Sequence, residues 1–534
     1  MTNSSETKVP LRGYERVLTM ADNGCMKIVH AMLLRSSSTT GAADVAADSA
    51  FSVFLRHLPE ALVLTFNKHP RMRAKQVKGE FAMAEIEPPL TLESLWQDNL
   101  LQVRELSGTT SDHAGDDSTA TNWEKYAEAE CDRPLDRFSE LPFYVRIWVY
   151  PSEGAMRVML FSDHYMSDGI SGLTVLNDMM SFAAELSLGP ATTHQTLPLC
   201  PSLYDLWMKP QPIKHFVSKA LAKLFGKMLH KHELKHFTPI LPPRSNQSDF
   251  TLPVEINSSS VRFGDGSPEN MKKALRRCKE ESVTFFGALA AAVTVALYAA
   301  RGDDVSGQQA DQGAGNAQRF KLHLSLPFNM RQRVPSPPEE TPVGAYMAGS
   351  GLESFQNAGV DMQKTRFWDV ARNAKQEIDA ALNSFAMPLP VVFYDKFVHA
   401  KMKPEFLYDI SVPHSAISDC DISNIGRYPF KTTHQFNTRA NGLSPINSGD
   451  QIKDIAIESV HVCNSIPHLG PASCVYVTSV KHFSYAMMHK FDQSQGDKLF
   501  AAFVASVEHI GDVDGDKTMA DVAKSVQARL LDSV

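Results

Sequence analysis

Two neighbouring apolar segments constrain the fold of this chain more than any other feature. In residues 143–150, Phe-Tyr-Val-Arg-Ile-Trp-Val-Tyr, apolar side chains recur at every second position, as on a buried strand. The turn sequence Pro-Ser-Glu-Gly follows, and a second apolar segment covers residues 155–163. This pattern predicts a β-hairpin with a four-residue connection. The second strand leads directly to His164, so we expect that side chain at the rim of a sheet.

Other segments repeat their apolar residues with the helical period. They predict helices at residues 51–69, 170–186, 267–282, 284–300 and 367–385. Short alternating segments predict strands at residues 321–326, 473–480 and 482–488. Helices and strands are mixed in both halves of the chain, which favours an α/β sandwich that occurs twice.

The 534 residues are too many for one ordinary core, since a domain usually holds about 100–200 residues. The prolines and polar run of residues 240–253 predict a linker between an N-terminal subdomain, 1–239, and a C-terminal subdomain, 254–534. Polar stretches predict surface loops at residues 36–49, 107–122 and 302–318.

Composition narrows the function classes. The formal charge of −7 shows no basic excess for nucleic-acid binding. The seven cysteines are odd in number and form no C-x-x-C pair, so we expect a reducing, cytoplasmic compartment. Residues 1–8 lack the apolar core of a signal peptide, and the apolar run at 285–300 is shorter than the roughly 20 residues of a membrane span.

Several familiar site patterns are missing. The chain contains no phosphate-binding glycine loop of the P-loop or Rossmann type and no G-x-S-x-G nucleophile motif. The histidines and cysteines between residues 461 and 489 do not have zinc-ligand spacing, so we expect no metal site.

The segment His164-Tyr-Met-Ser-Asp168-Gly169 carries the most chemistry. Histidine has an ordinary pKa near about 6.5, so its neutral form can remove a proton from an alcohol, and a positioned base typically supplies about 10²–10⁴-fold. We expect Asp168 to hold the turn or an arginine rigid, and Gly169 to allow backbone angles that other residues adopt at a cost. On spacing alone, a solvated surface turn remains the alternative.

The wider context resembles one superfamily. Residues 163–172 are similar to the H-H-x-x-x-D-G motif of chloramphenicol acetyltransferase, peptide-synthetase condensation domains, plant acyl-CoA-dependent acyltransferases and fungal alcohol acetyltransferases. The segment Asp421-Ile-Ser-Asn-Ile-Gly426 resembles the S-N-l-G of the alcohol acetyltransferase branch. Further stretches match in order at Phe66–Arg73, Cys131–Pro142, Val283–Ala292 and Leu326–Arg331, so the resemblance spans roughly residues 10–500.

This resemblance implies an α/β fold of two chloramphenicol acetyltransferase-like sandwich subdomains with an active-site tunnel between them. His164 would be the general base, and transfer would proceed without a covalent acyl-enzyme. Asp168 would pair with an arginine of the second half, for which Arg331 is the candidate; an ordinary surface arginine is the alternative. Ser423 and Asn424 would line the tunnel, and either one would help to stabilise the oxyanion; a turn formed by Asn424-Ile-Gly426 is the alternative.

The resemblance therefore predicts an acyl-CoA-dependent O- or N-acyltransferase, with O-acylation preferred. The expected partners are acyl-CoA, as a co-substrate and not a bound cofactor, and a small alcohol or amine acceptor; a monomer is expected. A condensation-type enzyme with carrier-protein-bound substrates and a non-catalytic binding protein are the alternatives. Two departures matter: Asp163 replaces the first histidine of the motif, and the D-F-G-W-G motif of the plant branch is missing.

Residues 207–237 form a basic amphipathic segment with seven lysines. The favoured interpretation is a solvated helix that covers one subdomain. The alternatives are weak, reversible contact with a membrane surface, which would make the protein peripheral to a membrane, and an entry helix that attracts an anionic donor.

Overall fold

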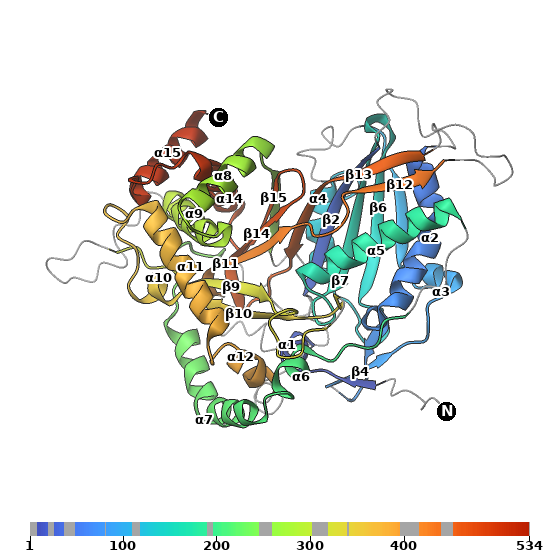
Figure 1. The fold of residues 1–534 in the computed structure, drawn as a ribbon, viewed down its shortest axis with the longest axis horizontal. Coiled ribbons are helices and arrows are strands. Elements are labelled where there is room, and N and C mark those ends of the chain that lie inside the picture. Colours follow the sequence, from blue (N-terminus) through green and yellow to red (C-terminus); the bar gives the residue numbers. More distant parts are fainter. Residues whose placement is uncertain are drawn as a thin grey trace.

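The computed structural model describes residues 8–19, 26–36, 49–80, 82–108, 118–189, 196–244, 259–301, 319–338, 341–395, 416–438 and 452–532. They form two lobes, each built on a six-stranded mixed sheet that helices cover (Figure 1). This is the expected α/β fold with two subdomains.

The first sheet has the strand order β12-β13-β2-β7-β6-β5. The predicted hairpin is confirmed as β6 and β7, which pair antiparallel with Val145 opposite Leu160. A short 3-10 turn and Gly154, at a φ of 56°, connect the two strands. The strand bounds are β2 (Lys27–Ser36), β5 (Leu101–Glu105), β6 (Phe143–Tyr150), β7 (Ala155–Asp163), β12 (Thr433–Asn437) and β13 (Ile452–Asn464).

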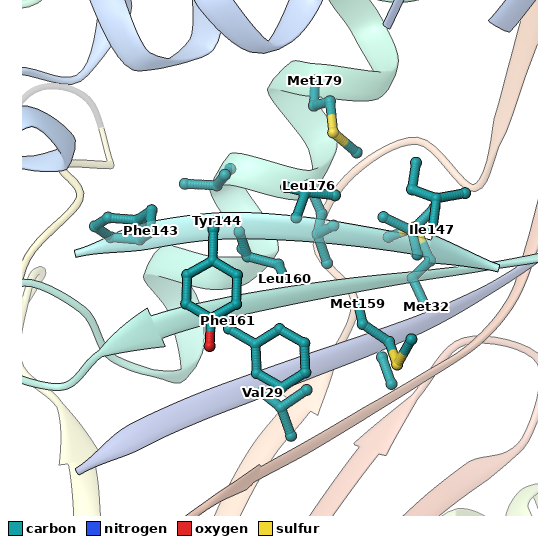
Figure 2. Close-up of a cluster of buried hydrophobic side chains, with 14 of the residues drawn as sticks. Val29, Met32, Phe143, Tyr144, Ile147, Met159, Leu160, Phe161, Leu176 and Met179 are labelled. Carbon is teal, nitrogen blue, oxygen red and sulfur yellow. The ribbon is translucent and has the colours of Figure 1, made fainter. Parts of the chain in front are cut away.

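Helices α2 (Ala50–Lys68) and α5 (Gly169–Leu188) pack against each other over this sheet. Leu176 of α5 lies over the strands with Leu160 of β7 (Figure 2). On the opposite face, the rings of Tyr144 and Phe161 stack with centroids 5.2 Å apart. Every residue of β6 and β7 is buried, because both faces of the hairpin are covered. The strand that ends at His164 is therefore held firmly.

The second sheet has the order β10-β9-β11-β14-β15-β8. Its strands are β8 (Ser260–Asp265), β9 (Leu324–Asn329), β10 (Met347–Gly351), β11 (Ala416–Arg427), β14 (Gly470–Ser479) and β15 (Phe483–His489). The helices are α8 (Pro268–Glu280), α9 (Phe285–Arg301), α11 (Phe367–Asn383), α14 (Gln493–His509) and α15 (Met519–Asp532). The alanine-rich α9, predicted as a helix at 284–300, is buried and packs against α11 and α14.

Two predicted elements need correction. The strand expected at 321–326 runs instead from Leu324 to Asn329, because Phe320 already pairs with Val360 and the chain enters the sheet later. The basic segment 207–237 is two helices, α6 (Leu203–Met208) and α7 (Pro212–His236). Pro212 starts α7, since a proline lacks the N–H that a continuous helix would need there.

The sheets do not follow the expected division of the chain. Strands β12 and β13 come from residues 433–464, yet they complete the sheet of the first lobe. Strand β13 also contacts β14 and β15 of the second lobe. Residues 245–253 of the expected linker lie outside the described residues, and so do most residues of the three expected surface loops. At the start of the linker, the N–H of Ile240 donates to Oδ1 of Asp419 at 2.7 Å. The boundary at 240–253 stays a prediction.

The remaining elements lie around the two lobes. A small sheet has the order β1-β4-β3. In the described part of the chain, no single helix is long and apolar enough to span a membrane, and α8 with α9 meet that test only as a pair bent by 110°. The other bounds are β1 (Lys8–Pro10), β3 (Ala74–Gln76), β4 (Met83–Ile86), α1 (Tyr14–Leu18), α3 (Leu92–Gln97), α4 (Trp123–Asp132), α10 (Glu353–Asn357) and α12 (Leu389–Phe393).

Candidate active site

His164 is the first residue after β7, in the turn that leads to α5. Its N–H donates to the carbonyl of Met26 at 2.9 Å, which continues the pairing of β7 with β2 beyond the last strand residue. The imidazole is buried, and its Nδ1 lies 2.9 Å from the carbonyl oxygen of Ser167. A carbonyl oxygen only accepts hydrogen bonds, so Nδ1 carries the hydrogen. The lone pair of Nε2 is therefore available to accept a proton.

Asp168 caps the N-terminus of α5: its Oδ1 accepts the N–H of Ser171 at 2.9 Å. Arg331 contacts both oxygens of this carboxylate, with Nη1–Oδ2 at 2.8 Å and Nη2–Oδ1 at 3.0 Å. The N–H of Tyr346 donates to Oδ2 at 2.9 Å. Burial alone would raise the pKa of Asp168, but Arg331 and these N–H groups outweigh it and hold the pKa below its usual range. Asp168 is thus a charged structural group.

Arg331 joins the two lobes. It follows β9 of the second sheet, and its partner Asp168 begins a helix of the first. The guanidinium also donates to the carbonyl of Pro342, at 3.1 Å from Nε, and to the hydroxyl of Ser171 at 2.8 Å. Only 2% of Arg331 is exposed, so this is a buried bidentate pair and not a surface contact. The family resemblance named these two residues as a candidate pair, and the structure brings them together.

Gly169 requires a correction. Its φ is not positive, so unusual backbone angles do not explain the glycine. A Cβ at this position would instead lie 2.5 Å from Cδ1 of Ile425, on β11 of the second lobe. The missing side chain lets the start of α5 approach the Ser423–Gly426 strand closely.

His30 on β2 supports the same turn and was not predicted from the sequence. Its Nε2 lies 2.9 Å from the carbonyl of Gly169, to which it donates. Burial lowers the pKa of His30 to about 4, although that hydrogen bond opposes the shift, so the ring is neutral near pH 7. A Cβ on Gly172 would lie 2.1 Å from the His30 ring. Gly172 is therefore needed for His30 to fit beneath the helix.

Asp163 stands where relatives carry a first histidine. The Nε of Arg137 donates to its Oδ2 at 2.9 Å, and both side chains are almost fully buried. The N–H of Tyr165 donates to Oδ1 at 3.3 Å. These contacts tie the turn to the segment before the hairpin, so Asp163 has a structural explanation.

A cavity of about 370 Å³ lies in front of His164 and is lined from both lobes. Ser423 and Asn424 of β11 line this cavity, as the resemblance implied for the tunnel. Asp168 and Gly169 line it too. In the part of the chain that the structure describes, no lysine or arginine side chain lines it. Further polar lining comes from Asn329, Asp421, Asn464 and Tyr476; apolar lining includes Val17, Leu18, Met26, Ile28, Ile170, Phe328, Met347, Ile417, Ile425, Val462, Ile466 and Leu469.

Asp421 is a cavity residue that the sequence reasoning quoted without giving it a role. Its Oδ1 accepts the hydroxyl of Ser418 at 2.9 Å and also that of Ser325. Burial raises its pKa above the usual range, although the two hydroxyls and Lys490 oppose the shift. The signal that could have identified Asp421 from the sequence is a charged residue in the segment that carries the S-N-I-G motif.

The described residues hold no group of three or more histidine, cysteine, aspartate or glutamate side chains placed to bind a metal ion.

Solved structures share this fold. The trichothecene 15-O-acetyltransferase of Fusarium sporotrichioides aligns with a TM-score of 0.63 and 12% identity, over 95% of this chain and 97% of that one. The first condensation domain of the calcium-dependent antibiotic synthetase gives 0.59 and 13%, over 97% and 99%. The condensation domain of the monacolin K polyketide synthase gives 0.55 and 11%, over 97% and 100%. These likenesses show the fold, which is the predicted chloramphenicol acetyltransferase-like one.

Sequence comparison is more specific about the family. No curated protein sequence matches the chain significantly. The family model of the alcohol acetyltransferases, however, matches residues 139–441, which is more than half of the chain. That range contains the β6–β7 hairpin, the His164–Gly169 turn, Arg331 and the Asp421–Gly426 strand. The chain therefore belongs to the alcohol acetyltransferase family, the branch of acyltransferases that its motifs predicted.

Proposed function

We propose that this protein transfers an acyl group from an acyl-CoA thioester to the hydroxyl of an apolar alcohol, with His164 as the general base. The observation that carries the proposal is the hydrogen bond from Nδ1 of His164 to the Ser167 carbonyl. In the neutral imidazole this places the lone pair on Nε2, and His164 lines a cavity to which both lobes contribute. A two-sided cavity suits a reaction in which donor and acceptor must meet.

The proposed reaction has one acyl transfer and no acyl-enzyme. The alcohol O–H donates to Nε2 of His164 while its oxygen attacks the thioester carbonyl carbon. The new C–O bond forms as the proton moves to Nε2, and the tetrahedral intermediate carries the charge on the former carbonyl oxygen. The C–S bond then breaks, and the imidazolium returns its proton to the leaving thiolate. The ester and coenzyme A leave, and His164 is neutral again.

We assign stabilisation of the oxyanion to the polar residues of β11. Ser423 and Asn424 both line the cavity on the strand that lies against Gly169. A hydroxyl or amide donor aimed at a developing oxyanion is typically worth about 2.7–4 kcal/mol. Asp168 and Arg331 do not take part chemically in this scheme, because they satisfy each other; they hold the turn that aims His164.

The lining favours an uncharged acceptor. Most of the lining side chains are apolar, and none of those described is a lysine or arginine that would pair with a phosphate or carboxylate. Both hydrogen bonds found for the Asp421 carboxylate among the described residues end at Oδ1. We therefore assign Oδ2 the role of accepting a hydrogen bond from a second hydroxyl of the acceptor. We prefer O-acylation because the family model that matches the chain is that of the alcohol acetyltransferases.

The test is a thiol-release assay with the purified full chain. Acyl-CoAs of increasing length are combined with alcohols and amines, and products are identified by mass spectrometry. We expect release with an alcohol acceptor, a large loss in the His164→Ala variant, and no loss in a His57→Ala control on the surface of α2. Equal activity in both variants would refute the assignment of the base. Turnover only with a carrier-protein-bound donor would favour the condensation-type alternative, and binding without turnover would favour the non-catalytic one.

A further inference from the structure

The first half of α7, residues 212–225, presents its largest apolar side chains to solvent. Ile213 is 81% exposed, Phe216 74% and Leu224 70%, and Val217 and Phe225 are also exposed. Large apolar side chains on an ordinary surface helix face the core instead. An exposed patch of this kind on a protein usually marks an interaction surface.

The spacing puts all of these side chains except Phe225 on one face of the helix. Residues 216, 217, 220 and 224 lie three, four, seven and eleven positions after residue 213, so together with it they form one stripe, which we name the outer stripe. Among residues 212–225, the side of α7 that faces the protein uses small residues, since Ser218 and Ala222 are the buried ones there. The helix is therefore attached through small side chains and holds its large ones outward.

A small number of contacts fix α7 in this orientation. Nε2 of His215 lies 2.5 Å from the hydroxyl of Tyr204, a buried residue of α6. The ammonium of Lys214 lies 5.1 Å from the centre of the Phe385 ring, and α7 packs against α12. These contacts with the rest of the protein determine which face of α7 points to solvent.

Lysines flank the outer stripe. On a helical projection Lys214 lies along one border, and Lys219 and Lys223 lie along the other. The whole of α7 contains six lysines and one glutamate, in a chain whose formal charge is −7. An apolar face bordered by lysines matches a surface that is apolar inside and negatively charged outside.

We propose that α7 binds the surface of a membrane that contains anionic phospholipids. The outer stripe would enter the acyl-chain boundary, and the flanking lysines would contact the phosphate groups. Helix α7 does not meet the length and hydropathy test for a membrane-spanning helix. In this proposal it therefore lies in the plane of the membrane surface.

The position of α7 also gives a reason for such binding, which rests on the proposed function. Helix α12, against which α7 packs, is followed directly by Tyr394. Tyr394 lines the cavity, and its ring centre lies 5.0 Å from that of Tyr14 on the same wall. Apolar alcohols partition into bilayers, so a membrane-bound α7 places the cavity wall near the store of acceptor.

The binding test uses the full chain and vesicles of phosphatidylcholine with or without phosphatidylserine, separated by flotation. We expect the protein to float with anionic vesicles and to bind less at high salt. The triple variant I213S/F216S/L224S should lose binding to both vesicle types. The matched control L92S/L275S/L531S removes three exposed leucines from α3, α8 and α15 and should bind like the wild type. Near-identical circular dichroism and melting temperature establish that the variants are folded.

A second variant tests the charges. A lysine near an anionic membrane strengthens binding by about fivefold, so K214Q/K219Q/K223Q should bind anionic vesicles about 100-fold more weakly. Wild-type protein that stays unbound with every vesicle, or an outer-stripe variant that binds like the control, would overturn the proposal. A wild-type dimer in solution that the outer-stripe variant converts to a monomer would also overturn it, because a second copy would then cover the stripe.

Activity separates this proposal from the proposed function. All variants should acylate a short water-soluble alcohol at the wild-type rate without vesicles, because the outer stripe lies outside the cavity lining. If the wild type shows no acyl transfer but floats with anionic vesicles, the proposed function fails and the membrane surface stands. If it transfers acyl groups but does not float, the reverse holds.

Discussion

Breaking the Asp168–Arg331 pair on one side should destabilise the protein strongly. In Asp168→Asn the cap on α5 can persist, since asparagine caps helices as well as aspartate does. The charge is lost, however, and Arg331 is left 2% exposed without its carboxylate. Removing one partner of a buried ion pair typically costs about 3–5 kcal/mol. We expect that loss in the free energy of unfolding, measured by urea titration of tryptophan fluorescence.

The double variant Asp168→Asn/Arg331→Met sharpens this prediction. It removes both charges, and replacing a whole buried pair by uncharged groups is often nearly neutral. We therefore expect the double variant to be more stable than either single variant, with a coupling energy of about 2–4 kcal/mol. Additive losses, or an Asp168→Asn protein as stable as the wild type, would refute the reasoning.

The pH dependence gives an independent check on the same pair. The pKa of Asp168 is lower in the folded state than its ordinary value of 3.8, so the unfolded chain binds this proton more readily. The stability from Asp168 is therefore complete above about pH 4 and is lost as the pH falls through the folded-state pKa. The stability gap between wild type and Asp168→Asn should stay constant from neutral pH to about pH 5 and shrink below pH 4.

Three further outcomes follow from the site. Gly172→Ala should lower the free energy of unfolding by about 1–3 kcal/mol through overpacking, because its Cβ would meet the His30 ring. Gly189→Ala, where the added Cβ meets open space, is the control. Equal stability of the two variants in calorimetry would refute this account. Asp421→Asn should raise KM for diols while leaving simple alcohols unaffected, and an equal effect on both would contradict a contact with a second hydroxyl. Asn424→Ala should lower kcat about 10²–10³-fold with little change in KM if its amide stabilises the oxyanion; a change confined to KM would assign it to binding.

Local patterns were sufficient for the elements that surround the site. The alternation on both sides of Pro151–Gly154 predicted the hairpin, and the apolar run after Thr284 predicted a helix. Both succeed because a strand or helix is specified by side chains only a few residues apart. The same local order placed His164, Asp168 and Gly169 in a turn between a strand and a helix, and the resemblance of that turn supplied the family.

Contacts between distant residues were decided only by the tertiary structure. Asp168 and Arg331 are 163 positions apart; the family resemblance named them as a candidate pair, but only the packing of the two lobes brings the side chains into contact. No periodicity in the sequence indicates that β12 and β13 complete the first sheet, that His30 fits beneath Gly172, or that the large side chains of α7 face outward. The physical reason is that a sequence pattern states which side chains share a face, whereas the rest of the fold determines what that face contacts.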